Sequence, residues 1–148
     1  MISLDEYEYQ KYIQYEKDNK YDFVLKIYSG SVPYDKDSAI KINIYSRDLT
    51  RLDEYEILIK EKKYTINSSD FLDKLKTIIM NNLENLVKCS VAQTTDYIVN
   101  NSYDGGYYWN FKIKYANLII NIEGQIAEIE SFCDAFTDEI IHLINQSV

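Results

Sequence analysis

The chain has 148 residues and a net charge of −8. Its hydrophobic fraction of 46% suffices for a packed core, which excludes an intrinsically disordered acidic chain. The negative charge repels phosphate backbones, so direct nucleic-acid binding is disfavoured and a protein partner with a basic surface is favoured. With four glycines and one proline there is little room for a linker, and we expect one domain over residues 1–148.

The first ten residues, MISLDEYEYQ, lack the basic and apolar segments of a secretory signal. No run approaches the roughly 18 apolar residues that cross a bilayer. Cys89 and Cys133 fall on or beside apolar helix positions, a pattern typical of buried, reduced thiols. We therefore expect a cytoplasmic protein with no membrane contact and no disulfide framework.

The first half of the chain predicts a short helix, several strands and a long helix. Ser3 and Glu6 have the spacing of a capping box and predict a helix over about residues 4–16. Alternating apolar residues predict strands over 21–28, 40–45 and 55–59, with a break at 29–33 and a short partner strand around Tyr64. Apolar residues at helical spacing then predict a helix from Phe71 to about Cys89, with Asn82 interrupting its stripe.

The second half repeats this order. A weaker strand is predicted over residues 91–99, a turn over 100–106, two strands over 107–115 and 118–122, and a helix after Gly124. Because the strand connections are short, antiparallel pairing is favoured, and two amphipathic helices can cover one face. We expect an α+β fold: an antiparallel sheet of about five to seven strands packed against two long amphipathic helices, with a short N-terminal helix.

A shift of 54 residues suggests an internal repeat over residues 38–89 and 92–144, and within one eleven-residue window it brings four identical pairs into register, among them Ile59 with Ile113 and Asn67 with Asn121. This indicates a duplicated βββα unit. A chance alignment in a composition rich in Ile, Lys and Asn is the alternative interpretation. The order of the elements resembles that of type III secretion chaperones and their relatives. The resemblance implies a small, acidic and often dimeric protein.

Catalytic chemistry has few candidates in this chain. His142 is the only histidine, and helical periodicity puts it on a solvated face beside Asp138 and Glu139. Gly105 and Gly106 follow an aspartate in a pattern typical of a hairpin turn, not of a phosphate-binding loop. Adjacent carboxylates are inevitable among 24 acidic residues. We expect no enzymatic activity, no catalytic or metal-binding residues and no cofactor.

Charge distribution gives the stronger signal, because the chain contains no lysine or arginine after Lys114. Carboxylates near a helix C-terminus oppose the helix dipole, so helix stability does not explain the last acidic residues. They form either a solvated face or a partner-binding face. Two further candidate surfaces combine tyrosines with carboxylates, at the N-terminus and in the loop after residue 100. The predicted partner-binding residues are Glu128, Asp134, Asp138, Glu139, Tyr7, Tyr9, Tyr103, Asp104, Tyr107 and Tyr108.

Three hypotheses about function follow. The first is a small acidic inhibitor of the immunity, antitoxin or phage anti-defence type, which uses carboxylates and tyrosines to mask a basic surface of a partner such as a nuclease. The second is a module similar to secretion chaperones that binds a protein segment as a homodimer. The third is a small-ligand-binding domain with a pocket near Trp109 and Tyr107.

Overall fold

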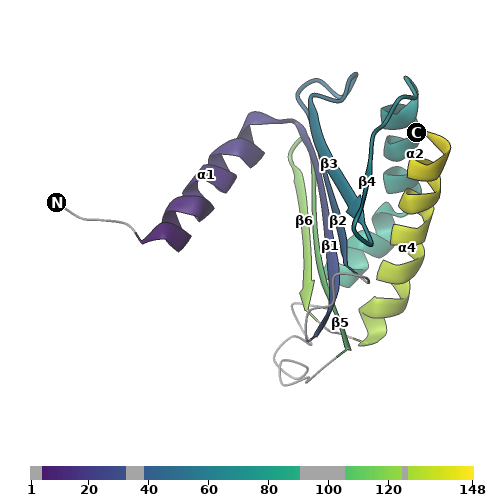
Figure 1. Cartoon of the computed structure of the whole chain (residues 1–148). Coiled ribbons are helices and arrows are strands. Elements are labelled where there is room, and N and C mark those ends of the chain that lie inside the picture. The colour runs from purple at the N-terminus through teal and green to yellow at the C-terminus, as the bar shows by residue number, and fades with distance from the viewer. Residues whose placement is uncertain (1–4, 33–38, 91–105, 125–126) are drawn as a thin grey trace.

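The computed structural model describes residues 5–32, 39–90, 106–124 and 127–148. In this part of the chain six strands form one antiparallel sheet, and helices α2 (Phe71–Asn81) and α4 (Ala127–Gln146) cover one of its faces (Figure 1). Helix α1 (Glu6–Lys20) lies on the opposite side and projects away from the sheet. The predicted α+β class with an antiparallel sheet is confirmed.

The sheet has β1 near its middle. The strand order is β4-β3-β2-β1-β5-β6, and every neighbouring pair is antiparallel. A further helical stretch occupies residues 83–90. The strands are β1 (Phe23–Val32), β2 (Ile40–Ser46), β3 (Glu54–Ile59), β4 (Lys62–Tyr64), β5 (Gly106–Tyr115) and β6 (Leu118–Gly124).

The inner face of the sheet, which we define as the face toward α2 and α4, forms the core. Alternation puts every second strand residue on this face, and the register stacks Leu25 between Ile44 and Ile113. Full burial of each such side chain contributes about 1.5–3 kcal/mol. The buried residues are Phe23, Leu25, Ile27, Ile42, Ile44, Ile57, Ile59, Phe111, Ile113, Ile120 and Ile122 from the strands, and Phe71, Leu72, Leu75, Ile79, Leu86, Cys133, Phe136, Ile140, Leu143 and Ile144 from the helical segments and the C-terminus of the chain.

Three predicted boundaries, one of β1 and two of α1, are wrong. Strand β1 does not break at Ser29 but continues to Val32, because β5 pairs with it along its whole length, as far as Val32 opposite Gly106. Helix α1 begins after Asp5, whose side chain accepts a hydrogen bond from the backbone N–H of Glu8 at 2.9 Å, so Ser3 is not its N-cap. It also runs to Lys20, four residues past the predicted end.

Asn82 separates α2 from the helical stretch over residues 83–90, as the interrupted stripe indicates. Its backbone N–H donates to the carbonyl oxygens of Ile78 and Ile79, and its side-chain amide donates to the Ile78 oxygen at 2.8 Å. The asparagine therefore satisfies carbonyls that the end of α2 would otherwise leave unpaired.

The two hairpins compared by the 54-residue shift lie at opposite ends of the sheet (Figure 1). Each is followed in the chain by a helix on the inner face, α2 after β4 and α4 after β6. The predicted strand over residues 91–99 and most of the predicted turn after it lie outside the described residues. Duplication stays a prediction.

The two-residue turn between β3 and β4 is strained. Lys60 and Glu61 have φ angles of 51° and 67°, in the left-handed region that favours asparagine and glycine. Replacing them by Asn and Gly (K60N/E61G) should raise the free energy of unfolding by about 1–2 kcal/mol, measured by urea denaturation. The control K62G places glycine in strand β4 and should lower the free energy of unfolding. Equal effects of the two changes would show that the turn is not strained.

Candidate functional site

The predicted acidic face of α4 is exposed. Asp134, Asp138 and Glu139 lie on the side of the helix away from the sheet, and His142 is exposed beside them. This is the position that helical periodicity predicts for the histidine. Glu128 lies in the first turn of α4, but its side chain is outside the described residues.

Carboxylates on the neighbouring helical segments pair with lysines, whereas Asp134 and Asp138 on α4 do not pair with any lysine of the described residues. Around α2 and the 83–90 stretch, ion pairs one turn apart join Asp70 to Lys74 and Glu84 to Lys88, at 3.2 and 3.1 Å. No ion pair within the described ranges reaches Asp134 or Asp138. Partial burial and the neighbouring charge of Asp138 raise the pKa of Asp134. The α4 face is therefore a local excess of negative charge.

A groove adjoins this face between α2 and α4. Its cavity has a volume of about 340 Å³ and is lined by Lys74, Thr77, Ile78, Glu139, His142, Leu143 and Gln146. The Glu139 carboxylate accepts a hydrogen bond from the Asn82 amide at 2.8 Å, which fixes its position beside the break between the helical segments. The wall of Ile78 and Leu143 suits the aliphatic stem of a partner's lysine or arginine. The polar lining holds one carboxylate, Glu139, together with His142 and with Lys74, which pairs with Asp70.

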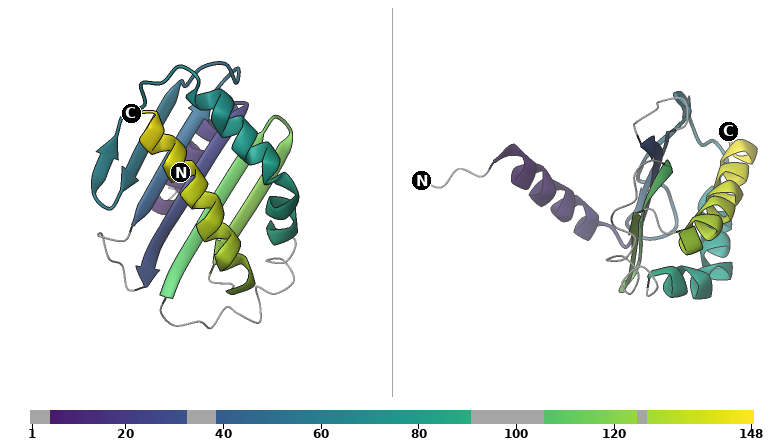
Figure 2. Two further views of the ribbon diagram at one scale, coloured as in Figure 1. Left: turned by 90° about the vertical axis from the view of Figure 1, so that its right-hand side faces the viewer. Right: turned by 90° about the horizontal axis from the view of Figure 1, so that it is seen from below.

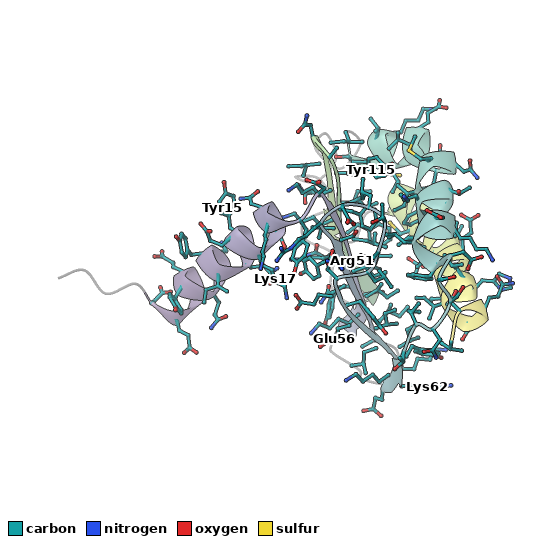
Figure 3. All side chains as sticks on the ribbon, turned by 90° about the horizontal axis from the view of Figure 1, so that it is seen from above. Tyr15, Lys17, Arg51, Glu56, Lys62 and Tyr115 are labelled. Atoms are coloured by element: carbon teal, nitrogen blue, oxygen red, sulfur yellow. The ribbon has the colours of Figure 1, made fainter. Side chains whose placement is uncertain are left out.

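Helix α1 presents the second predicted surface. Tyr9, Tyr12 and Tyr15 are 52%, 58% and 64% exposed. Figure 3 shows Tyr15 on the projecting helix, whereas Lys17 lies toward its sheet end. The side chain of Tyr7 is outside the described residues.

A buried carboxylate anchors α1 to the outer face of the sheet, the face opposite α2 and α4. Asp18 is 4% exposed and meets two lysines from neighbouring strands. Its side-chain oxygens lie 2.9 Å from Lys26 Nζ on β1 and 2.6 Å from Lys112 Nζ on β5. The amide of Gln14 donates to Asp18 at 2.8 Å, and Lys114 Nζ donates to the backbone oxygens of Asp18 and Tyr21 at 3.2 and 2.7 Å.

The protonation of this cluster follows from its contacts. Burial alone would raise the pKa of Asp18, but hydrogen bonds from Lys112, Lys26 and Gln14 outweigh it and hold the pKa below its usual value. Burial lowers the pKa of Lys26, although Asp18 opposes the change. Two lysines thus share one carboxylate, and the cluster keeps a positive charge.

The predicted residues do not form one surface. Helix α1, which carries the tyrosines, and helix α4, which carries the carboxylates, lie on opposite sides of the sheet (Figure 1). Tyr103 and Asp104 lie outside the described residues. Tyr107 and Tyr108 belong to β5, but their side chains are not among those that the structure describes. The predicted ligand pocket near Trp109 likewise depends on side chains that are not described.

Sequence reasoning missed the Asp18 cluster. Asp18 and Lys112 are 94 residues apart, and only the pairing of β1 with β5 brings the two strand lysines together. The sequence signal that could have indicated this cluster was the alternation of polar with apolar positions along β1 and β5.

Other chemistry is limited within the described ranges. No group of three or more histidine, cysteine, aspartate or glutamate residues there could hold a metal ion. No helix there is long and apolar enough to cross a bilayer. Cys133 is buried and Cys89 half-buried, neither is joined to another cysteine in a disulfide, and burial raises the pKa of the Cys89 thiol. The predicted burial is confirmed for Cys133, whereas Cys89 is only half-buried.

No family model matches the chain, and neither a curated protein nor a solved structure matches it.

Removing the anchoring charge should loosen α1. Asp18→Asn leaves Lys26 and Lys112 without their carboxylate, and should lower the free energy of unfolding by about 1–3 kcal/mol at pH 7. Because the folded-state pKa of Asp18 is depressed, its contribution is present above the usual aspartate pKa and lost as pH falls through the folded value. The difference from wild type, measured by urea denaturation, should therefore shrink below about pH 4.

The control is Asp22→Asn, which changes an exposed aspartate immediately before β1. Trypsin should cleave D18N faster than D22N within α1, which contains Lys11, Lys17 and Lys20. Equal stability and equal cleavage of the two variants would show that the cluster does not hold the helix.

Proposed function

We propose that the protein is a small acidic inhibitor of the immunity, antitoxin or phage anti-defence type, which binds a basic surface of a protein partner through α4 and the adjoining groove. The observation that carries the proposal is the pair Asp134 and Asp138, exposed side by side with no cation reaching them in the described part of the chain. A partner's lysines and arginines would supply the missing counter-charge.

The physical basis is electrostatic complementarity. An excess of one sign of charge steers an oppositely charged protein during diffusional encounter and excludes partners of like charge. Proteins that act on nucleic acids carry basic surfaces that bind phosphates, so carboxylates on a helix are effective competitors for such a surface. A nuclease is therefore the kind of partner that fits best.

The groove adds a site for an anchor residue. Interfaces concentrate binding energy in a few side chains that enter well-packed pockets. An arginine of the partner could lay its stem along Ile78 and Leu143 and bring its guanidinium to Glu139. Because α1 lies across the sheet from α4, its tyrosines do not belong to this binding surface.

The proposal is tested with the partner captured from a native-host lysate on tagged wild-type protein. After purification, its affinity is measured for D134N/D138N and for the control D73N/E84Q. Each variant loses two negative charges, but the control removes acids that already have lysine partners. D134N/D138N should bind at least about tenfold more weakly, and the control nearly as well as wild type. Equal affinities of both variants, or a captured partner with an acidic surface, would contradict the proposal.

The same variant should fold more stably. Like charges one helical turn apart destabilise a helix, so D134N/D138N should raise the free energy of unfolding by a few tenths of a kcal/mol at pH 7. The folded-state pKa of Asp134 is raised, so wild type regains this stability as pH falls through that value. The gain, measured by urea denaturation, should vanish below about pH 4. A loss of stability at pH 7 would show that these carboxylates support the helix.

A further inference from the structure

The outer face of the sheet is only partly covered. Val24 and Tyr45 are buried with Tyr21 where α1 joins the sheet. Farther along the strands an open band crosses the sheet, and only α1 among the described elements lies on this side (Figure 2). The band is defined by the cross-strand neighbours Lys63, Leu58, Lys41, Tyr28 and Asn110, all exposed.

Helix α1 carries an apolar stripe with nothing in the described chain packed on it. Tyr9, Tyr12 and Ile13 are three and four residues apart and are 52%, 58% and 43% exposed, so they share one side of the helix. The residues that anchor α1 to the sheet are Gln14, Asp18 and Lys17, which pairs with Glu54 on β3 at 2.6 Å. They lie about 140° farther round the helix at 100° per residue. The side of α1 that holds its own sheet is therefore not the side that carries the stripe.

This geometry leaves the apolar stripe of α1 apart from a band of mixed character, in which Leu58 and Tyr28 are the large hydrophobic residues and Lys41 pairs with Glu56. Bending α1 down onto its own sheet would press the anchoring side against the strands and leave the stripe in solvent. A helix of 15 residues is marginal in water without tertiary packing. Nothing in the described part of the chain covers the stripe, which leaves it available for contact with another molecule.

We propose that the occupant is a second copy of the chain: the α1 stripe of each protomer lies across the open band of the other. A helix of 15 residues is about 22 Å long, and five adjacent strands span about 19 Å from first to last. A single helix packed on a single sheet buries little surface area, but in a two-fold symmetric dimer the same contact occurs twice. The buried area then approaches the roughly 1,200–2,000 Å² of a stable interface.

The charges also match. The first turn of α1 carries Glu6 and Glu8 after Asp5. Among the described residues the outer face has more cations than carboxylates: Glu54 and Glu56 each pair with one lysine, Lys17 and Lys41, whereas Lys26 and Lys112 share Asp18 and Lys114 donates to backbone oxygens. The outer face is thus locally basic on an acidic protein, and the free end of α1 is its acidic counterpart.

The dimer does not depend on the proposed inhibitor function. The α4 faces lie on the far side of each sheet from the dimer contact, so both stay accessible. If the protein does not dimerise, the partner-binding experiment is unaffected. If no partner binds through α4, the dimerisation experiment is likewise unaffected.

Sedimentation equilibrium of the full chain at micromolar concentration tests the dimer. Wild type should be dimeric. The stripe variant Y12S/I13E and the band variant Y28S/L58K should each raise the dimer Kd at least about tenfold. The control Met80→Glu changes an equally exposed apolar residue on the other side of the sheet and should leave Kd unchanged. Circular dichroism checks that each variant is folded. A monomeric wild type, or a dimer weakened only by the control, would overturn the proposal.

Disulfide cross-linking shows which surfaces meet. In a background of C89S and C133S, one protomer carries Y12C and the other L58C, with tags of different mass. Oxidation of the mixture should give a covalent heterodimer, whereas Y12C with M80C should not. Cross-linking of Y12C protein to itself alone would show helix-to-helix pairing and overturn the docking on the sheet. Cross-linking within a single chain that carries both Y12C and L58C would do the same.

Discussion

Burial of one face of the sheet under α2 and α4 is the constraint on which the other features depend. Phe23, Leu25 and Ile27 on β1 point to the inner face and alternate with residues that point to the outer face. Because the inner face collects the apolar residues, most of the polar and charged residues of the strands lie on the outer face. The same packing turns the apolar stripe of α4 inward and its carboxylates outward. Both candidate surfaces, the acidic helix face and the open band, follow from this single division of the sheet.

The helices on the two faces of the sheet are held by different kinds of contact. Apolar packing fixes α2 and α4, and such packing tolerates little displacement. Helix α1 is fixed mainly by polar contacts, which are the Asp18 cluster with its two lysines and Gln14 and the ion pair of Lys17 with Glu54 on β3, and their hydrogen bonds are directional. Its direction is therefore well defined at the sheet end, while its apolar stripe stays accessible to another molecule.

Local pattern was sufficient to predict the elements but not their long-range contacts. Alternation identified β2 and β3, and helical spacing identified α4 and placed His142 on its exposed side. The extension of β1 through Ser29 was missed because β5, some 80 residues later, decides it. Asp18 was missed for the same reason. The acidic face of α4 could be predicted because it depends only on residues of one helix and on the charge pattern after Lys114.

The position of β1 has a consequence for how the chain folds during synthesis. One edge of β1 meets β2 almost immediately, but the other needs β5, and Ile27 pairs with Phe111. At about 5–20 residues per second, a ribosome takes several seconds to make the intervening segment. During that time the nascent chain exposes an unpaired strand edge and an uncovered apolar face, which are sites of aggregation. Refolding of the full-length chain avoids this delay, because every strand is present from the start.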